Sequence, residues 1–407
     1  MTISKIGIIR EGKVPQDKRV PLTPEQILTV KAKFPNVQIV AQTSDIRCFD
    51  DNWYRKVGVE VVDSLEDCDL IMGVKEVNIA DLIPNKKFMF FSHTCKLQPY
   101  NRKLLQAILD QNIQLIDYEV LKDASGKRLI GFGRYAGIVG CYNGFLTYGL
   151  KSGAYELKPA HVCEDRHLVE EELEKVVLPK DARIVLTGFG RVGNGAREIL
   201  SHIGVREVSP SEFLTQQFDE PVYTHLDTKD YFARVSDGGF DKSEFYSEPE
   251  KYESILYKFM TNTIMYIPCH FWSSKSPFVL SKERILNDCP QLQVVADVSC
   301  DIDGPIGCTV RPSTIADPIY GYDPKTGLEA DWKLEGNIAV MAVDNLPCEL
   351  PRDASRDFGN EMIKNILPAL LGDDPTDIIG RGSETTLDGE LTSHFEYLRE
   401  YAYGVKA

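Results

Sequence analysis

The sequence predicts an α/β protein that contains two doubly wound parallel sheets. Short apolar runs alternate with polar, helix-compatible segments from residue 5 to residue 117, which is typical of a parallel sheet with helices on both faces. A further apolar strand then leads into a glycine-rich turn and an amphipathic run within Val185–Leu200. The chain has 407 residues, of which 43% are hydrophobic, and this length fits two or three domains with sizeable cores.

The apolar runs place the strands in order along the chain. In the first domain we expect strands at Lys5–Ile9, Val37–Ala41, Asp69–Val74, Lys87–Phe91 and Gln114–Asp117, with intervening helices that include Pro24–Phe34 and Pro99–Gln111. In the second domain we expect strands at Ala182–Leu186, Thr263–Ile267, Leu292–Val298 and Ile338–Val343. Small and apolar residues across Gly137–Tyr155 predict a closely packed helix that joins the domains, in spite of the helix penalty of its glycines.

These elements suggest the domain boundaries. We expect the first domain to comprise residues 1–136 and 346–407, because the tail is a helical segment of the kind that usually returns to an earlier domain. Its apolar residues recur at helical spacing, at Phe358, Met362, Ile366 and Leu370. Residues 137–345 then form the second domain. The polar stretch Ser209–Lys258 has weak periodicity, and it predicts a long excursion at about 209–262.

Composition excludes several classes of function. There are 46 basic and 61 acidic residues, and the net charge of -15 disfavours nonspecific binding to nucleic acid or to anionic membranes. The start of the chain lacks the apolar core of a signal peptide and no run is long enough to span a membrane, so we expect a cytoplasmic protein. Ten cysteines without a Cys-x-x-Cys pair predict reduced, mostly buried thiols and no zinc site, and Cys269-His270 is interpreted as structural.

The glycines of the second domain fit the pattern Gly-x-Gly-x-x-Gly at Gly188, Gly190 and Gly193, with Arg191 and Val192 between them. The first glycine permits a tight turn, the second lets the backbone approach a pyrophosphate, and the third lets helix and strand pack closely. The motif predicts a bound dinucleotide. An acidic residue about 20 positions after the first glycine usually holds the ribose hydroxyls. Glu207 lies near that position, whereas Arg206 suits a 2′-phosphate, so NAD and NADP both remain open.

Polar side chains follow several of the predicted strands, at the edge of the sheet where ligands bind in open parallel sheets. In the first domain these side chains are Arg19, Lys75, His93, Lys96 and Glu119. Each alone is more often a solvated charge or a satisfied core histidine. A buried edge that carried all of them would have to satisfy every one without a ligand, which favours a binding site.

Acidic and amide side chains follow two strands of the second domain. Asp297, Asp301 and Asp303 come after one strand, and Asp344 and Asn345 come after another. Three acids at such spacing can bind a metal ion, but the EF-hand pattern and an accompanying histidine are absent. We expect these side chains to face the nicotinamide of the dinucleotide instead.

Together these motifs resemble the alanine dehydrogenase and pyridine nucleotide transhydrogenase superfamily, and within it the lysine-forming saccharopine dehydrogenases and the lysine–ketoglutarate reductase domain. The blocks that carry the resemblance are Arg19-Val-Pro-Leu-Thr-Pro, Gly73-Val-Lys-Glu, Phe91-Ser-His-Thr-Cys-Lys, Asp117-Tyr-Glu, Arg128 to Gly137, Asp297-Val-Ser-Cys-Asp and Asp344-Asn-Leu-Pro-Cys-Glu-Leu-Pro-Arg. The resemblance covers nearly the whole chain and implies two Rossmann-like domains that flank a cleft.

The resemblance also implies a function and site residues. It implies an NAD(P)-dependent oxidoreductase that acts on the CH–NH bond of saccharopine or a related N-substituted amino acid. Lys75 and His93 would be the acid/base groups. The residues expected to hold the substrate are Arg19, Lys96, Glu119, Arg128 and Phe132, and those expected near the nicotinamide include Asp301 and Asn345. A lysine whose pKa is lowered by burial beside cations, together with a histidine, suits the successive proton transfers at nitrogen and oxygen.

Two alternatives remain at this point. One is an alanine-type amino acid dehydrogenase, which shares the lysine, histidine and arginine but handles a smaller substrate. The other is a dinucleotide-binding sensor without turnover. Lys96 and the Phe-Gly-x-x-Ala-Gly segment at Phe132 look like the saccharopine branch, whose substrate has several charged ends. We expect a small-molecule amino acid as the partner and no nucleic acid or membrane, and the sequence leaves the oligomeric state open.

Overall fold

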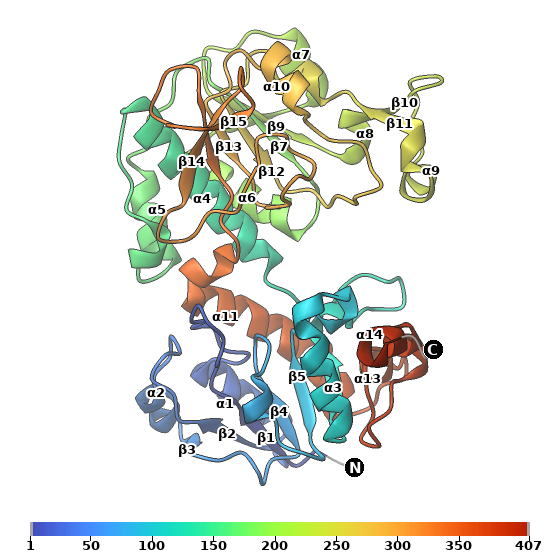
Figure 1. The fold of residues 1–407 in the computed structure, drawn as a ribbon. Coiled ribbons are helices and arrows are strands. Elements are labelled where there is room, and N and C mark those ends of the chain that lie inside the picture. The colour runs from blue at the N-terminus through green and yellow to red at the C-terminus, as the bar shows by residue number, and fades with distance from the viewer. Residues whose placement is uncertain (1–2, 405–407) are drawn as a thin grey trace. The chain divides into compact units, whose positions relative to one another are not determined.

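The computed structural model describes residues 3–404 and divides into two compact units (Figure 1). The first unit comprises Met1–Phe132 and Pro351–Ala407, and the second comprises Gly133–Leu350. Figure 1 shows the blue amino-terminal segments and the red carboxyl-terminal helices within the same unit.

The first unit is built on a six-stranded sheet in which every neighbouring pair of strands is parallel. The strand order is β3-β2-β1-β4-β5-β6, the order of a doubly wound fold with its switch point between β1 and β4. The strands are β1 (Lys5–Ile8), β2 (Gln38–Gln42), β3 (Glu60–Val62), β4 (Leu70–Met72), β5 (Lys87–Phe90) and β6 (Gln114–Asp117). Five of these match predicted strands, whereas the edge strand β3 was missed because its three residues are partly exposed and form no long apolar run.

Helices cover both faces of this sheet. They are α1 (Pro24–Lys33), α2 (Asp51–Lys56), α3 (Arg102–Asp110), α11 (Pro351–Glu361), α12 (Leu367–Leu371), α13 (Ile378–Arg381) and α14 (Arg399–Tyr403), with a π-helical turn at Met362–Ile366. Thr23 and Gln26 form a capping box that starts α1. The tail packs into the unit's core through Phe358, Met362 and Ile366, which are fully buried. The helical spacing noted in the sequence therefore marks a buried face.

The second unit contains an eight-stranded mixed sheet in the order β15-β14-β16-β13-β12-β7-β9-β8. The strands are β7 (Arg183–Thr187), β8 (Arg206–Val208), β9 (Val222–Leu226), β12 (Met265–Pro268), β13 (Val294–Ala296), β14 (Ile319–Asp323), β15 (Leu328–Ala330) and β16 (Ile338–Met341). The run from β8 to β16 is parallel, and β14 and β15 extend it in antiparallel pairing. Two doubly wound sheets are thus present, and the predicted fold class is confirmed.

Residues 222–226 lie inside this sheet and not in an excursion, which corrects the sequence interpretation. Strand β9 is buried at all five residues and pairs with β7 on one side and β8 on the other. The strand could not be recognised in the sequence because it contains polar residues. Tyr223 donates a hydrogen bond to Glu207 (2.7 Å), and His225 Nε2 bonds the carbonyl oxygen of Gly188 (2.8 Å). A hairpin of β10 (Phe232–Arg234) and β11 (Tyr252–Ser254), with α9 (Lys242–Ser247) between its strands, does project from the unit (Figure 1).

The long helix α4 (Gly133–Ser152) carries the glycines that the sequence made conspicuous. A Cβ atom at Gly137 would lie 1.8 Å from the carbonyl oxygen of Val192, so α4 and α6 pack backbone against backbone. Tertiary packing therefore outweighs the helix penalty of these glycines. The other helices of the unit are α5 (Arg166–Leu173), α6 (Arg191–Ile203), α7 (Pro210–Thr215), α8 (Thr228–Tyr231) and α10 (Lys282–Asp288).

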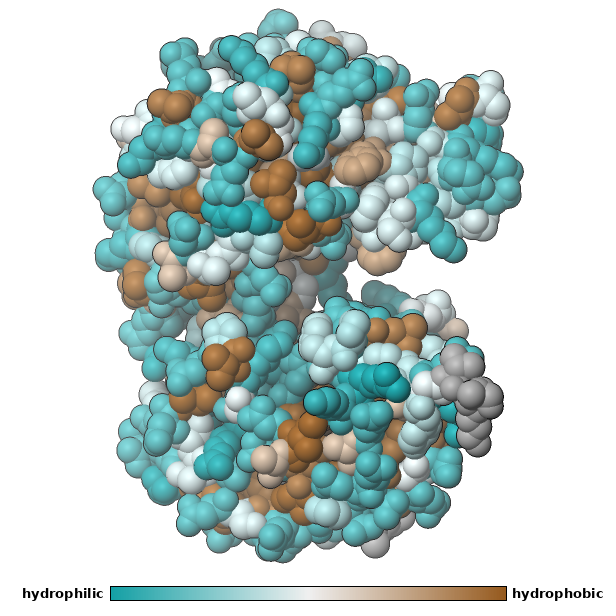
Figure 2. Space-filling model, in the orientation of Figure 1, coloured by the Kyte–Doolittle hydropathy of each residue, from teal (hydrophilic) through white to brown (hydrophobic). Residues whose placement is uncertain are grey.

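The surface agrees with the strongly acidic composition. Figure 2 shows mainly hydrophilic residues on the visible face of each unit, with separate, small hydrophobic areas. Among residues 3–404, no helix combines the length and apolar character that crossing a bilayer would require. All ten cysteines are free thiols, and six of them are buried.

Candidate active site

Three neighbouring strands of the first unit end in polar residues at one edge of the sheet. Lys75 follows β4, His93 follows β5, and Glu119 lies in the short helix Tyr118–Val120 that follows β6. Because β4, β5 and β6 are adjacent and parallel, their carboxyl ends lie side by side. Glu11, which follows the neighbouring β1, joins them by accepting the backbone N–H groups of Val74 (2.6 Å) and Lys75 (3.0 Å).

His93 lies between two carboxylates. Its Nδ1 is 2.6 Å from Glu76 Oε1, and its Nε2 is 3.9 Å from Glu119 Oε2. Burial alone would raise the pKa of Glu76, but hydrogen bonds from His93 and from Lys13 (2.8 Å) lower it to about 2. Glu76 is therefore a carboxylate, so His93 donates through Nδ1. The 3.9 Å separation at Nε2 is too long for a hydrogen bond and leaves this nitrogen able to bond another group.

Lys75 is half-buried, and its ammonium group has no hydrogen-bond or ion-pair partner among residues 3–404. Burial lowers the pKa of Lys75, and the positive charges of Arg19 and Lys13 lower it further. This is the environment that the sequence interpretation expected. Beside it, burial raises the pKa of Glu11 to about 8, and the Asp17 carboxylate adds to this effect.

Glu119 binds two of the predicted cations, Lys96 and Arg128. Lys96 Nζ lies 3.1 Å from its Oε2, and Arg128 donates a hydrogen bond to its Oε1. Burial would raise the pKa of Glu119, but Arg128 and Lys96 outweigh this effect and lower it. The structure thus brings Lys96, Glu119 and Arg128 together with His93, although Arg128 comes from a loop beyond the strand.

Arg19 and Phe132 also meet, but Arg19 already holds a carboxylate of the protein. The Arg19 side chain is only 2% exposed, and it donates from Nε (3.0 Å) and Nη2 (2.6 Å) to the two oxygens of Asp17. Its guanidinium carbon lies 4.1 Å from the centre of the Phe132 ring, which in turn stacks on Phe358. The sequence predicted the arginine fork, but it missed Asp17 as the acid that this fork binds.

The glycine motif of the second unit has the geometry of a phosphate-binding turn. Gly188 has φ of +100°, and a Cβ atom there would lie 2.5 Å from the carbonyl oxygen of Cys269. A Cβ atom at Gly193 would lie 1.7 Å from the carbonyl oxygen of Gly188, so only glycine lets α6 pack this closely on the turn. At Gly190, the N-cap of α6, a Cβ atom would meet nothing within 4 Å, which leaves open space at the helix N-terminus.

This open space belongs to a cavity of 690 Å³ at the carboxyl ends of β7, β9, β12 and β13. Its lining residues are Gly188, Phe189, Gly190, Val192, Asp227, Thr228, Tyr231, Lys242, Tyr246, Cys269, His270, Phe271, Trp272, Val298, Ser299 and Asp301. Gly188, Gly190, Val192 and Asp301 were predicted. Arg191 and Gly193 belong to the same turn of α6 without lining the cavity.

Other predicted cofactor residues lie away from this cavity. Arg206 and Glu207 are on the edge strand β8, where Arg206 pairs with Glu220 (2.7 Å) and Glu207 with Arg197 (2.7 Å). Asp344 and Asn345 follow β16, and neither lines the cavity.

Asp227 is an acidic residue of the cavity that the sequence reasoning did not single out. It follows β9, the strand that lies directly beside β7 on the side away from β12, so it occupies the place where dinucleotide-binding folds hold the ribose. One of its oxygens caps α8 by accepting the Thr228 N–H (2.8 Å). The run Val-Tyr-Thr-His-Leu-Asp227 would have indicated this acid if its polar residues had been recognised as part of a strand.

Of the three acids that follow β13, two have a structural role or do not line the cavity. Asp297 is fully buried and accepts hydrogen bonds from Ser299 N (3.1 Å), Ser299 Oγ (2.6 Å) and Thr309 Oγ1 (2.6 Å), which fix the turn after β13. Asp303 is exposed, with φ of 49°. Asp301 is thus the member of this group that lines the cavity, and burial raises its pKa.

Comparison with protein families confirms the resemblance stated from the sequence motifs. Residues 7–139 match the family model described as the N-terminal domain of alanine dehydrogenase/PNT. Most of this match lies in the first unit, and its last residues lie at the start of α4. Lys75, His93, Lys96, Glu119, Arg128 and Phe132 all lie within the residues matched to this domain.

Curated proteins are similar over most of the length of this chain. Alpha-aminoadipic semialdehyde synthase of Arabidopsis thaliana is 29% identical over 97% of this chain, and the mouse protein of that name, described as mitochondrial, is 27% identical over 97%. The chain spans only 41% and 47% of those proteins. Saccharopine dehydrogenase [NAD(+), L-lysine-forming] of Neurospora crassa is 25% identical over 80% of this chain and 81% of its own length.

Solved structures share the fold. An L-alanine dehydrogenase superposes with a TM-score of 0.64 at 16% identity and covers 98% of both chains. A transhydrogenase from Sinorhizobium meliloti gives 0.60 at 12% identity, over 95% of this chain and 100% of its own. Identities this low relate the folds alone, and the mitochondrial name of the mouse relative leaves the cytoplasmic location a prediction.

Proposed function

We propose that this chain is an NAD(P)-dependent oxidoreductase that forms or cleaves the CH–NH bond of saccharopine or a closely related N-substituted amino acid. One observation carries the proposal: a half-buried lysine without a partner stands on the same sheet edge as a histidine oriented by a carboxylate. Charged groups that suit a substrate with several charged ends surround them. The names of the Arabidopsis and Neurospora relatives support the same chemistry.

The cavity of the second unit fits a nicotinamide dinucleotide. Gly188 and Gly190 give the pyrophosphate an open approach to the N-terminus of α6, and Asp227 can accept a hydrogen bond from a ribose hydroxyl. When bound, the dinucleotide would accept or supply the hydride. Asp227 favours a free 2′-hydroxyl, whereas Lys242, which also lines the cavity, favours a 2′-phosphate. The preference between NAD and NADP depends on which of these two residues dominates.

Lys75 would move the proton at the substrate nitrogen. Because its pKa is lowered, Lys75 gives up its proton more readily than an ordinary lysine, and its neutral amine can accept a proton from a secondary ammonium group and return it when lysine leaves. Loss of hydride then leaves an imine. His93 would remove a proton from the water that adds to this imine, since Nδ1 donates to Glu76 and Nε2 can accept.

The charged groups around Glu119 would orient the substrate. Lys96 and Arg128 are both partly exposed, so a substrate carboxylate can reach them, and Glu119 can hold an ammonium group. Arg19 was expected to bind the substrate directly, but its role would be different. Since Asp17 occupies its fork, Arg19 would mainly contribute positive charge next to Lys75 and a rigid contact with Phe132.

The test is the change in reduced-nicotinamide absorbance with two substrate pairs. We expect oxidation of NADH or NADPH with lysine plus 2-oxoglutarate, and much slower oxidation with pyruvate plus ammonia. The reverse ranking would favour an alanine-type dehydrogenase. Tight binding of the dinucleotide without turnover on either pair, under conditions where the protein is folded, would favour the sensor and refute the proposal.

A further inference from the structure

The carboxyl-terminal tail holds the loop that carries His93 and Lys96. We define this loop as residues 92–98 and the tail segment as residues 383–401. The tail segment runs beside β6, because Glu384 N donates to the carbonyl oxygen of Leu115 (2.8 Å). From there Tyr397 OH donates to the carbonyl oxygen of Cys95 (3.1 Å), and Tyr401 OH donates to that of Gln98.

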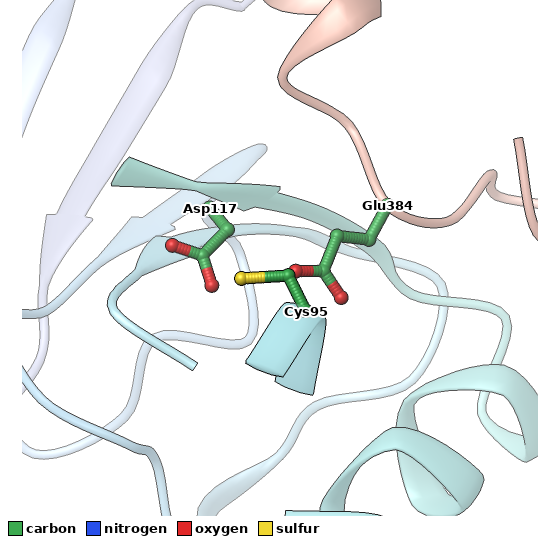
Figure 3. Close-up of side chains that lie close together, drawn as sticks. All are labelled: Cys95, Asp117 and Glu384. Carbon is green, nitrogen blue, oxygen red and sulfur yellow. The ribbon is translucent and has the colours of Figure 1, made fainter. Parts of the chain in front are cut away.

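A pair of buried acids lies where the two segments meet. Figure 3 shows the side chains of Asp117, from the end of β6, and Glu384, from the tail segment, close together beside Cys95. One ligand atom from each of the three residues lies within 4.8 Å of the other two. Both acids are fully buried.

The 92–98 loop binds both acids through its hydroxyl groups. Asp117 accepts hydrogen bonds from Ser92 N (2.9 Å) and from Ser92 Oγ. Glu384 Oε2 accepts one from Thr94 Oγ1 (2.5 Å). Glu384 Oε1 is different, because it is buried and accepts no hydrogen bond from any N–H or O–H group of residues 3–404. The adjacent Asp117 carboxyl can satisfy it only if one of the two acids keeps its proton.

The surroundings favour such a shared proton. Burial raises the pKa of Asp117 and, far more, that of Glu384, and the two charges raise each other's pKa. The titratable groups that face the pair are Cys95, Tyr118, Glu119, Tyr397 and Tyr401. None of these five is a cation, and the nearby Lys96 is paired with Glu119. A proton is therefore the simplest counter-charge available to the pair.

The loop needs an external restraint because its backbone is strained. His93 has φ of 55° and Leu97 has φ of 58°, both in the left-handed region, which is unfavourable for a non-glycine residue unless the surroundings fix it. Three hydrogen bonds supply this restraint. Thr94 donates to Glu384, and the carbonyl oxygens of Cys95 and Gln98 accept from tyrosines of the tail segment.

We propose that Glu384 is a positioning residue: by sharing one proton with Asp117, it fixes the 92–98 loop in the conformation that presents His93 and Lys96. The inference rests on the proposed function for its effect on turnover, but not for its effect on the loop. Because the pair keeps its shared proton only below the raised pKa of Glu384, the restraint is complete at low pH and is lost as the pH rises through that pKa.

The test compares Glu384→Gln, Glu384→Ala and the wild type. The glutamine amide keeps an N–H donor and an acceptor without titrating, so it should restore most of the rate that Glu384→Ala loses. A misplaced catalytic loop can cost about 100-fold, so we expect kcat of Glu384→Ala to fall by about 10- to 100-fold with cofactor affinity unchanged. Glu390→Gln, on the exposed part of the tail, is the matched control and should behave as wild type.

Hydrogen exchange of the 92–98 amides separates this inference from the proposed function. We expect protection of the loop to decrease at high pH in the wild type relative to Glu384→Gln, and to be low at every pH in Glu384→Ala, whether or not turnover is detected. Equal protection in all three proteins would overturn the inference. So would a glutamine variant as impaired as the alanine variant, or stoichiometric zinc in the purified wild type that Glu384→Gln lacks, since either result would require the carboxylate itself.

Discussion

Replacing Lys75 by methionine tests the central residue of the proposed mechanism. Methionine has a similar length and flexibility but no amine. Lys75 is half-buried, and its pKa is lowered by burial and by the charges of Arg19 and Lys13. Its ammonium group makes no hydrogen bond or ion pair within residues 3–404, so the substitution removes a chemical group without breaking an internal contact.

The structure sets the size of two separate effects. Loss of a general acid/base group lowers kcat by about 10²- to 10⁴-fold, which corresponds to about 3–5 kcal/mol of transition-state stabilisation. The free energy of unfolding should stay constant or increase, because the variant no longer desolvates an unpaired charge. If Lys75 were instead one half of a buried ion pair, its removal would destabilise the fold by about 3–5 kcal/mol.

Three measurements distinguish these outcomes: kcat with lysine plus 2-oxoglutarate, cofactor affinity by fluorescence titration, and the free energy of unfolding in urea. Lys103→Met, on the exposed face of α3, is the matched control and should retain wild-type values. A Lys75→Met enzyme as fast as the wild type would remove Lys75 from the mechanism. Slow turnover accompanied by a loss of several kcal/mol of stability would indicate a structural role.

Three further predictions concern the cofactor site and the pH profile. Gly190→Ala should weaken dinucleotide binding at unchanged thermal stability, whereas Gly193→Ala should reduce both, because its Cβ atom would lie 1.7 Å from a carbonyl oxygen; calorimetry and binding titration check this. Asp227→Ser should raise the kcat/KM ratio of NADPH to NADH, and Glu207→Gln should leave it unchanged. Lys13→Met removes a cation that faces the lysine after β4, so the pKa of that lysine should rise and the corresponding limb of the kcat/KM pH profile should move to higher pH, which a pH series measures.

Much of the first unit could be predicted because its signals are local. Strand β6 begins and ends at the predicted residues, and β1, β4 and β5 differ from prediction only at their ends. Parallel strands bring their carboxyl ends to one edge whatever the lengths of the connections, so polar residues at strand ends meet there. Lys75, His93 and Glu119 could therefore be grouped without knowing how the intervening helices pack.

The glycine turn of the second unit shows the limit of this local reasoning. The spacing rule that selected Glu207 assumes that the second strand along the chain lies next to the first in the sheet. Here β8 is at the edge and β9 takes the inner place, so Asp227 stands beside the glycine turn. Sheet pairing is a long-range property, and the polar, fully buried β9 gave no periodic signal of its position.

The sequence by itself determined the fold class, the glycine turn and the residues at the ends of the strands, since each follows from a local pattern of apolar, small and polar residues. Only the tertiary structure decided which charges meet. In the folded chain Arg19 binds Asp17, and His93 bonds Glu76. Lys96 and Arg128 both contact Glu119, and Asp117 is buried close to Glu384 from the far end of the chain. Electrostatic interactions depend on distance in space and on burial, and neither quantity can be read from separation along the chain.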